Sequence, residues 1–160
     1  RAEVAPRYRE YLRVWKDTGH PGRANIGYWV LVYVDETDEK AVAKARQYFT
    51  YCFTKVFGTR AEGGIGYQRL AENFTNRGDP GGAEIARHAV DLDYLLARNL
   101  AFVGSPKTVI DRIKSAATEG VFNTVLGEFN IGDIAEEDLM RSIRLFGTEV
   151  LPALRNFEPY

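Results

Sequence analysis

Two short stretches of the sequence carry residues that could do chemistry. The first is Gly104-Ser105-Pro106, where a short apolar run turns directly into a helical pattern. Free backbone N–H groups at such a helix start bind anions such as a phosphate or a carboxylate, although Ser105 also suits a plain helix N-cap. The second is Glu128, near the end of a strand-like segment, whose carboxyl group suits acid/base chemistry if burial raises its pKa.

Other reactive residue types do not form a recognisable site in the sequence. Cys52 falls on the apolar stripe of a predicted helix, which is typical of an inert core thiol. His88 falls in another predicted helix and needs no role beyond packing or solvent exposure. We therefore expect no metal site and no Ser-His-Asp arrangement.

The composition is that of a soluble globular domain. The 160 residues are 45% hydrophobic and 27% charged, and 21 basic against 22 acidic side chains give a net charge of -1 without a long block of either sign. This balance argues against nucleic acid and against an anionic membrane as partners. No apolar run approaches the ~20 residues of a membrane span, and one cysteine suits a reducing compartment. We expect one cytoplasmic domain over residues 1–160.

Helical and strand patterns alternate along the chain, which is typical of parallel strands with helical crossovers. Gly120 is expected to end the helix that follows Ser105, and Pro152 to kink or shorten the last helix. Residues 58–82 form a loop-rich insertion with one helical piece over Tyr67–Phe74. The predicted helices cover residues 8–15, 38–56, 84–100, 106–120 and 139–154, and the predicted strands cover Tyr28–Val34, Ala101–Val103 and Val121–Phe129.

Three strands are too few for a closed α/β barrel, which typically needs about 250 residues. The sequence nevertheless resembles the C-terminal half of the bacterial-luciferase-like flavin-dependent oxidoreductases, with motifs in the same order over most of the chain. The resemblance weakens in the insertion at residues 58–82. The stretches that carry it are YWVLVYVDETDEKAVAKA, FVGSPKTVIDRIKSAATEGV and LGEFNIGDIAEEDLMRSIRLFGTEVLPALR.

The resemblance implies the C-terminal portion of a (β/α)8 TIM barrel whose N-terminal strands are absent. The active face of such barrels lies at the carboxyl ends of the strands. Gly104 and Ser105 are then candidates for cofactor binding, Phe129 and Asn130 for substrate binding, and Glu128 for catalysis. Asp35 lies at the same rim. The best-known catalytic His and Cys positions of the family belong to the absent half, so no further catalytic residue is identified.

Side-chain alternation predicts which strand residues face the barrel interior. Glu128 would lie near the barrel mouth, although a solvated carboxylate or one paired with an arginine is the alternative. The opposite face of the last strand suits packing under helices. The interior set is Trp29, Leu31 and Tyr33 together with Thr124, Leu126 and Glu128, and the helix-facing set is Val121, Val125 and Phe129.

The function implied is that of a flavin-dependent monooxygenase, in which reduced FMN is a cosubstrate and oxygen acts on an unidentified small organic molecule. Two-component oxygenation requires a separate flavin reductase as a partner, and family members of this type form homodimers. Two alternatives stay open. One keeps the fold but uses a deazaflavin for hydride transfer, and the other is a non-catalytic half-barrel that associates with itself to cover its exposed sheet edge.

Overall fold

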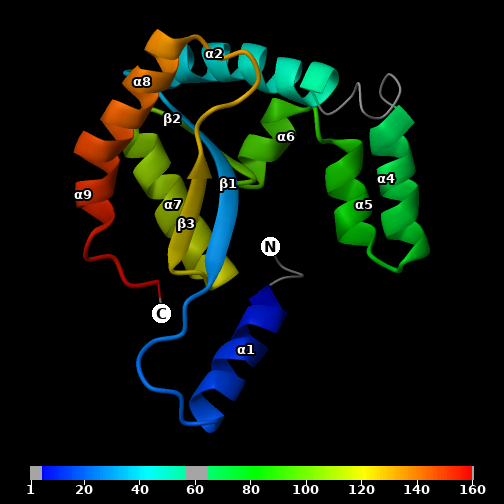
Figure 1. The fold of residues 1–160 in the computed structure, drawn as a ribbon, viewed down its shortest axis with the longest axis vertical. Coiled ribbons are helices and arrows are strands. Elements are labelled where there is room, and N and C mark those ends of the chain that lie inside the picture. Colours follow the sequence, from blue (N-terminus) through cyan, green and yellow to red (C-terminus); the bar gives the residue numbers. More distant parts are fainter. Residues whose placement is uncertain (1–4, 57–64, 160) are drawn as a thin grey trace.

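The computed structural model describes residues 5–56 and 65–159 and has one parallel sheet of three strands. The strands are β1 (Gly27–Val34), β2 (Ala101–Gly104) and β3 (Thr124–Glu128), in the order β2-β1-β3 (Figure 1). Since all three run in the same direction, their carboxyl ends meet at one edge of the sheet. Consecutive strands of a barrel are neighbours, whereas here the first strand lies between the other two.

One face of the sheet packs against α2 (Asp38–Tyr51), the π-helical turn η1 (Cys52–Val56) and α6 (Leu92–Ala97). Thr37, a residue type that favours the N-cap position, caps α2 by accepting a hydrogen bond from the Lys40 N–H at 3.3 Å. The core on this face is formed by Leu31, Tyr33, Ala41, Ala45, Tyr48, Phe49, Cys52, Leu92, Leu95, Leu96, Ala101, Val103 and Ile131.

The opposite face packs against α7 (Pro106–Gly120), with α1 (Ala5–Asp17) and the C-terminal helices around it. Helices therefore cover both faces of the sheet, whereas in a barrel they all lie outside (Figure 1). The prediction that Val125 and Phe129 pack under helices is confirmed. The buried residues on this face are Ile26, Val30, Val32, Val34, Phe102, Val109, Ile113, Ala116, Ala117, Phe122 and Val150.

The expected interior positions of β1 do not line a barrel in this chain. Leu31 and Tyr33 pack against α2 and α6, because those helices lie on the face that a barrel would leave for its interior. Trp29, on the same face but nearer the start of β1, is 60% exposed.

The C-terminal helical segment consists of α8 (Glu136–Leu145), the π-helical turn η2 (Phe146–Val150) and α9 (Leu151–Leu154). Pro152 has no N–H, and its ring would clash with a carbonyl one turn earlier in a regular helix. The chain avoids this by widening the preceding turn, where the Leu151 N–H donates to the Phe146 carbonyl five residues back. The expected disturbance near Pro152 is thus a π-helical turn.

The insertion is more helical than its composition indicates. It forms α4 (Ile65–Asn76) and α5 (Pro80–Arg87), a hairpin beside the sheet (Figure 1), while residues 58–64 lie outside the described residues. The continuous helix expected from Glu84 to Leu100 is wrong, since α5 ends at Arg87 and α6 begins after Asp91. The Asp91 carboxylate accepts a hydrogen bond from the Tyr94 N–H at 3.1 Å and starts a new helix.

The third strand begins later than predicted because the turn before it falls on Val121. α7 ends at Gly120, as predicted, and Val121 after it adopts the left-handed conformation with φ of +58°. The strand then runs only over Thr124–Glu128. Among the helices that the structure describes, none has the length and apolar character needed to cross a bilayer.

Candidate functional site

The most suitable place for a site is the end of β1. The connection from β1 to β2 runs through α2 on one face of the sheet, and the connection from β2 to β3 runs through α7 on the other face. The two connections therefore pass on opposite sides of the central strand β1. In open parallel sheets, ligands bind outside the carboxyl ends of the strands at such a point. A cleft of about 400 Å³ opens there, lined by Asp35, Glu36, Lys40, Ala43, Lys44 and Arg141.

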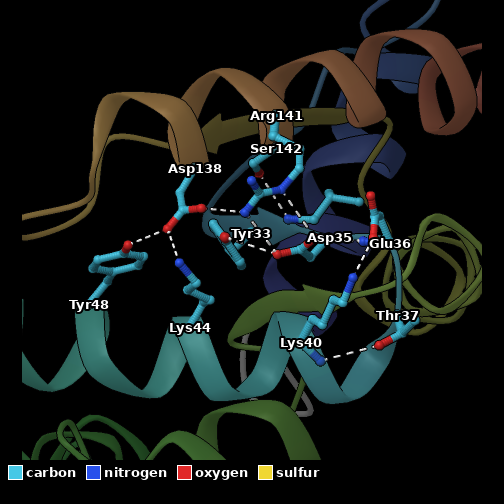
Figure 2. A network of polar contacts seen from close by, with 11 residues as sticks. Tyr33, Asp35, Glu36, Thr37, Lys40, Lys44, Tyr48, Asp138, Arg141 and Ser142 are labelled. Carbon is cyan, nitrogen blue, oxygen red and sulfur yellow. Dashed lines mark hydrogen bonds and ion pairs between the residues drawn. The ribbon is translucent and has the colours of Figure 1, made fainter.

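The first of two buried carboxylates in this region is Asp35, the residue directly after β1 (Figure 2). The Arg141 guanidinium donates from Nε to Asp35 Oδ1 and from Nη2 to Asp35 Oδ2, both at 3.2 Å. The Glu36 N–H also donates to Oδ1 at 2.8 Å, and the Tyr33 hydroxyl donates to Oδ2 at 3.3 Å. Asp35 is therefore fixed by hydrogen bonds at both oxygens.

The second buried carboxylate, Asp138 of α8, accepts hydrogen bonds from three side chains (Figure 2). The Lys44 ammonium and the Tyr48 hydroxyl each lie 2.5 Å from Oδ2, and Arg141 donates to Oδ1. Burial by itself raises the pKa of Asp138, but these hydrogen bonds outweigh it and lower the pKa to about 2. Asp138 is thus an anion at any physiological pH, and Arg141 bridges two buried carboxylates.

These contacts join three elements of the fold at the strand ends. Asp138, Arg141 and Ser142 lie on one face of α8, three and four residues apart. The Ser142 hydroxyl oxygen accepts from the Val34 N–H at 2.9 Å, so α8 is bonded to the last residue of β1. The ion pair with Lys44 connects α8 to α2. The polar face of α8 therefore fixes this helix over the end of the sheet.

Sequence reasoning missed this polar face. The apolar periodicity of the last predicted helix places Leu139 and Ile143 on its buried side, but Ile143 is 42% exposed. The residues buried in α8 are Asp138 and Ser142. The available signal was the spacing of Asp138, Arg141 and Ser142, which places one acid, one base and one hydroxyl on the same helix face.

The predicted anion-binding turn already holds an anion from the protein itself. The Ser105 N–H donates to Asp38 Oδ1 at 2.6 Å, and the Thr108 hydroxyl donates to Asp38 Oδ2 at 2.8 Å. The hydrogen bond from the Ser105 N–H holds the pKa of Asp38 below its usual range. Gly104 has φ of +152°, and a Cβ there would lie 2.9 Å from Asp38 Oδ1. Ser105 also caps α7, by accepting from the Thr108 N–H at 3.4 Å.

The three candidates at the end of β3 do not converge on one point. Glu128 is exposed, so the burial required for its predicted acid/base role is absent. Phe129 lies on the opposite side and packs edge-to-face on Phe146, with ring centroids 5.1 Å apart. Asn130 is exposed. No described contact joins these side chains to Ser105.

The remaining reactive residues lie outside the cleft. Cys52 is buried in the core, as its place on the apolar stripe predicts, and burial raises the pKa of its thiol. His88 is the C-cap of α5, and its ring stacks on Tyr94 with centroids 4.2 Å apart. Within residues 5–56 and 65–159, no cluster of His, Cys, Asp or Glu side chains is arranged to hold a metal ion.

Comparison with known proteins supports the family and the fold. The model of the luciferase-like monooxygenase family matches residues 1–123. The structure of the monooxygenase RslO1 from Streptomyces bottropensis aligns with a TM-score of 0.55 and 21% identity, over 92% of this chain and 38% of its own. No curated protein matches the chain.

A second structural neighbour is a type II Baeyer-Villiger monooxygenase, the oxygenating constituent of 3,6-diketocamphane monooxygenase from the CAM plasmid of Pseudomonas putida, in complex with FMN. It aligns with a TM-score of 0.58 and 24% identity, over 94% of this chain and 39% of its own. The present chain thus spans about two fifths of the length of both neighbours. The predicted fold class, part of a luciferase-like α/β barrel, is confirmed.

Proposed function

Because this chain belongs to the luciferase-like monooxygenase family, we propose that it forms part of a flavin-dependent monooxygenase. Reduced FMN and oxygen then act on a small organic substrate, and a separate reductase supplies the reduced flavin. The observation that carries the proposal is the family match over residues 1–123. The FMN bound to one structural neighbour supports this choice of flavin over a deazaflavin.

The residues described here do not by themselves form a site for FMN. The Ser105 N–H, the predicted phosphate donor, already donates to the Asp38 carboxylate. The cleft cations Lys44 and Arg141 are paired with buried carboxylates and Lys40 is paired with Glu36, and among the described residues no aromatic side chain lines the cleft. A phosphate at either place would have to displace a carboxylate. In the proposed enzyme, further strands of the barrel supply flavin contacts.

The role proposed for the cleft residues is positional. Asp35, Arg141 and Asp138 hold α8 and the end of β1 in a fixed arrangement through the buried hydrogen bonds described above. Such a network keeps a rim rigid where a cofactor or substrate must be oriented. Its residues act on the rim and not on the reacting atoms.

An uncovered part of the sheet favours the second candidate, a half-barrel that associates with itself. Trp29 of β1 and Leu126 of β3 are in register and are 60% and 54% exposed. Both lie on the face of Leu31 that α2 and α6 cover only in part. Adjacent exposed apolar side chains of this size mark an interaction surface. A second copy of the chain would cover them without any catalysis.

Titration of the purified chain with oxidised FMN, with sedimentation velocity on the same samples, distinguishes the two candidates. Trp15→Phe leaves Trp29 as the only tryptophan, and Trp29→Phe leaves Trp15 in α1 as the matched control. Saturable binding that quenches Trp29 and leaves Trp15 unchanged supports the flavin function. Self-association without flavin binding supports the half-barrel. A compact monomer at low concentration argues against the half-barrel.

A further inference from the structure

A second cavity lies away from the polar cleft, between β3, α7 and the C-terminal segment. Its volume is about 240 Å³. Val125 and Phe129 contribute from the strand side, Phe146 and Leu154 from the C-terminal helices, and Phe157 from the segment after α9. None of the functions predicted from the sequence uses this cavity.

The chemistry of the lining selects an uncharged occupant. Among the described residues, no charged side chain lines the cavity, and Asn123 is the only lining residue with a polar side chain. The Asn123 amide is already paired, since its Oδ1 accepts from the Ile26 N–H at 2.8 Å and its Nδ2 donates to the Ala24 carbonyl at 2.9 Å. An ion placed here would lose its hydration without gaining a partner.

The volume of the cavity and its aromatic wall favour a ring-shaped molecule. An apolar cavity of about 150 Å³ in a protein core holds benzene, so a cavity of about 240 Å³ accommodates a larger molecule, of two fused rings. The edge-to-face pair of Phe129 and Phe146 forms part of the wall, at 5.1 Å between centroids, and offers ring faces and edges for stacking.

The C-terminal segment is held in place by contacts outside the cavity. Glu158 forms an ion pair with Arg23, and the Lys114 ammonium lies 5.7 Å from the centre of the Phe157 ring. These contacts keep Phe157 and Pro159 in the cavity wall. The cavity wall is therefore formed by β3, by helices and by the residues after α9, and the contacts of Glu158 and Phe157 hold these last residues in place.

The lining is uncharged, the volume is about 240 Å³, and the one polar side chain in the wall, Asn123, is already hydrogen-bonded. From these observations we propose that the cavity is a binding site for a small uncharged apolar molecule of two fused rings. It lies on the face of the sheet opposite to α2, whereas the polar cleft is lined in part by Lys40 and Lys44 of α2. The proposal is therefore independent of the flavin function.

The test uses N-phenyl-1-naphthylamine, an uncharged fluorescent probe whose emission rises when it leaves water. We expect saturable binding of one probe per chain, displaced by naphthalene. Displacement by 1-naphthoate should need at least about tenfold more competitor, because its carboxylate loses hydration in an uncharged cavity.

Two neighbouring residues of β3 provide a matched pair of variants. Val125→Trp fills the cavity and should weaken probe binding at least about tenfold. Leu126→Trp adds the same side chain on the opposite, exposed face and should leave binding unchanged. Leu154→Trp fills the cavity from the helix side. If circular dichroism shows that Val125→Trp is unfolded, probe binding by Leu154→Trp is the test of the proposal.

The proposal is overturned if both cavity-filling variants fold and still bind the probe as the native chain does. It is also overturned if Leu126→Trp weakens binding as much as Val125→Trp, or if 1-naphthoate competes as well as naphthalene. Absence of any probe binding by the folded chain has the same meaning. None of these outcomes bears on flavin binding, so the two proposals fail separately.

Discussion

Replacement of Asp138 by Asn should destabilise the chain by removing the carboxylate that joins α8 to α2. Asp138 is 1% exposed and accepts hydrogen bonds from Lys44, Tyr48 and Arg141. The Asn side chain has nearly the same size, so no cavity forms. Its amide keeps one acceptor oxygen but presents an NH₂ group to a cation on the other side.

The size of this loss in stability follows from the pKa of Asp138 and from the exposed fractions of Lys44 and Arg141. The pKa of Asp138 is about 2 in the folded chain and about 3.9 in an unfolded chain, which corresponds to about 2.5 kcal/mol of stability. Breaking a fully buried pair costs about 3–5 kcal/mol. Since Lys44 and Arg141 are 42% and 35% exposed, water screens their charges, and we expect a loss of about 2 kcal/mol at pH 7.

The stability that Asp138 contributes should decrease as the pH falls. Because the pKa of Asp138 is lowered on folding, its contribution is complete above about pH 5 and is lost as the pH falls toward about 2. Asp138→Asn should therefore lower the free energy of unfolding at pH 7 and make it less sensitive to pH between about 5 and 2.

Urea denaturation followed by circular dichroism at several pH values measures both effects. The control is Glu36→Gln, which removes an exposed carboxylate paired with Lys40 and should change stability by less than about 0.5 kcal/mol. If Asp138→Asn loses less than about 0.5 kcal/mol at pH 7 and keeps the pH dependence of the native chain, the argument from the buried network is refuted.

Four further predictions concern single positions. Gly132→Ala should cost about 3 kcal/mol in urea denaturation, because φ is +64° and a Cβ would lie 2.5 Å from the Tyr48 carbonyl oxygen. Gly147→Ala, where nothing lies within 4 Å, should instead be neutral or stabilise by about 0.5 kcal/mol. Asp38→Ala should cost about 1 kcal/mol, measured in the same way, since the start of α7 loses its acceptor. Cys52 should react with a thiol reagent at least about 100-fold more slowly in the native chain than in urea at pH 8, because burial raises its pKa.

Local signals predicted the elements with strong start and stop residues. Thr37 and Ser105 both act as the N-caps that their positions indicate. The same reasoning failed where two signals compete over a few residues. Asp91 starts a new helix in what was expected to be a continuous one, since a cap residue preceding Leu92 outweighed the apolar periodicity.

The candidate site could be predicted only in part. The position of Asp35 at the rim followed from its place directly after a strand, and the structure places it there. Its partner Arg141 lies 106 residues away in the sequence and also donates to Asp138, and no local pattern connects either residue to β1. The anion expected at Ser105 turned out to be Asp38, a contact that depends on how α2 and α7 meet. Long-range polar partners of this kind follow from the tertiary arrangement and not from spacing.

The strand order also depends on what covers the sheet. A barrel leaves one face of its strands for an interior that eight strands enclose, whereas three strands cannot enclose anything. Both faces of β1 carry large apolar side chains, Leu31 and Tyr33 on one and Val32 and Val34 on the other, so both need a covering layer. Right-handed crossovers on opposite sides of β1 provide it, and they place β1 in the centre. Trp29 near the start of β1 and its register partner Leu126 in the middle of β3 are the part that α2 and α6 do not reach. A partner that supplies further strands would therefore compete with α2 for the face that now buries Leu31.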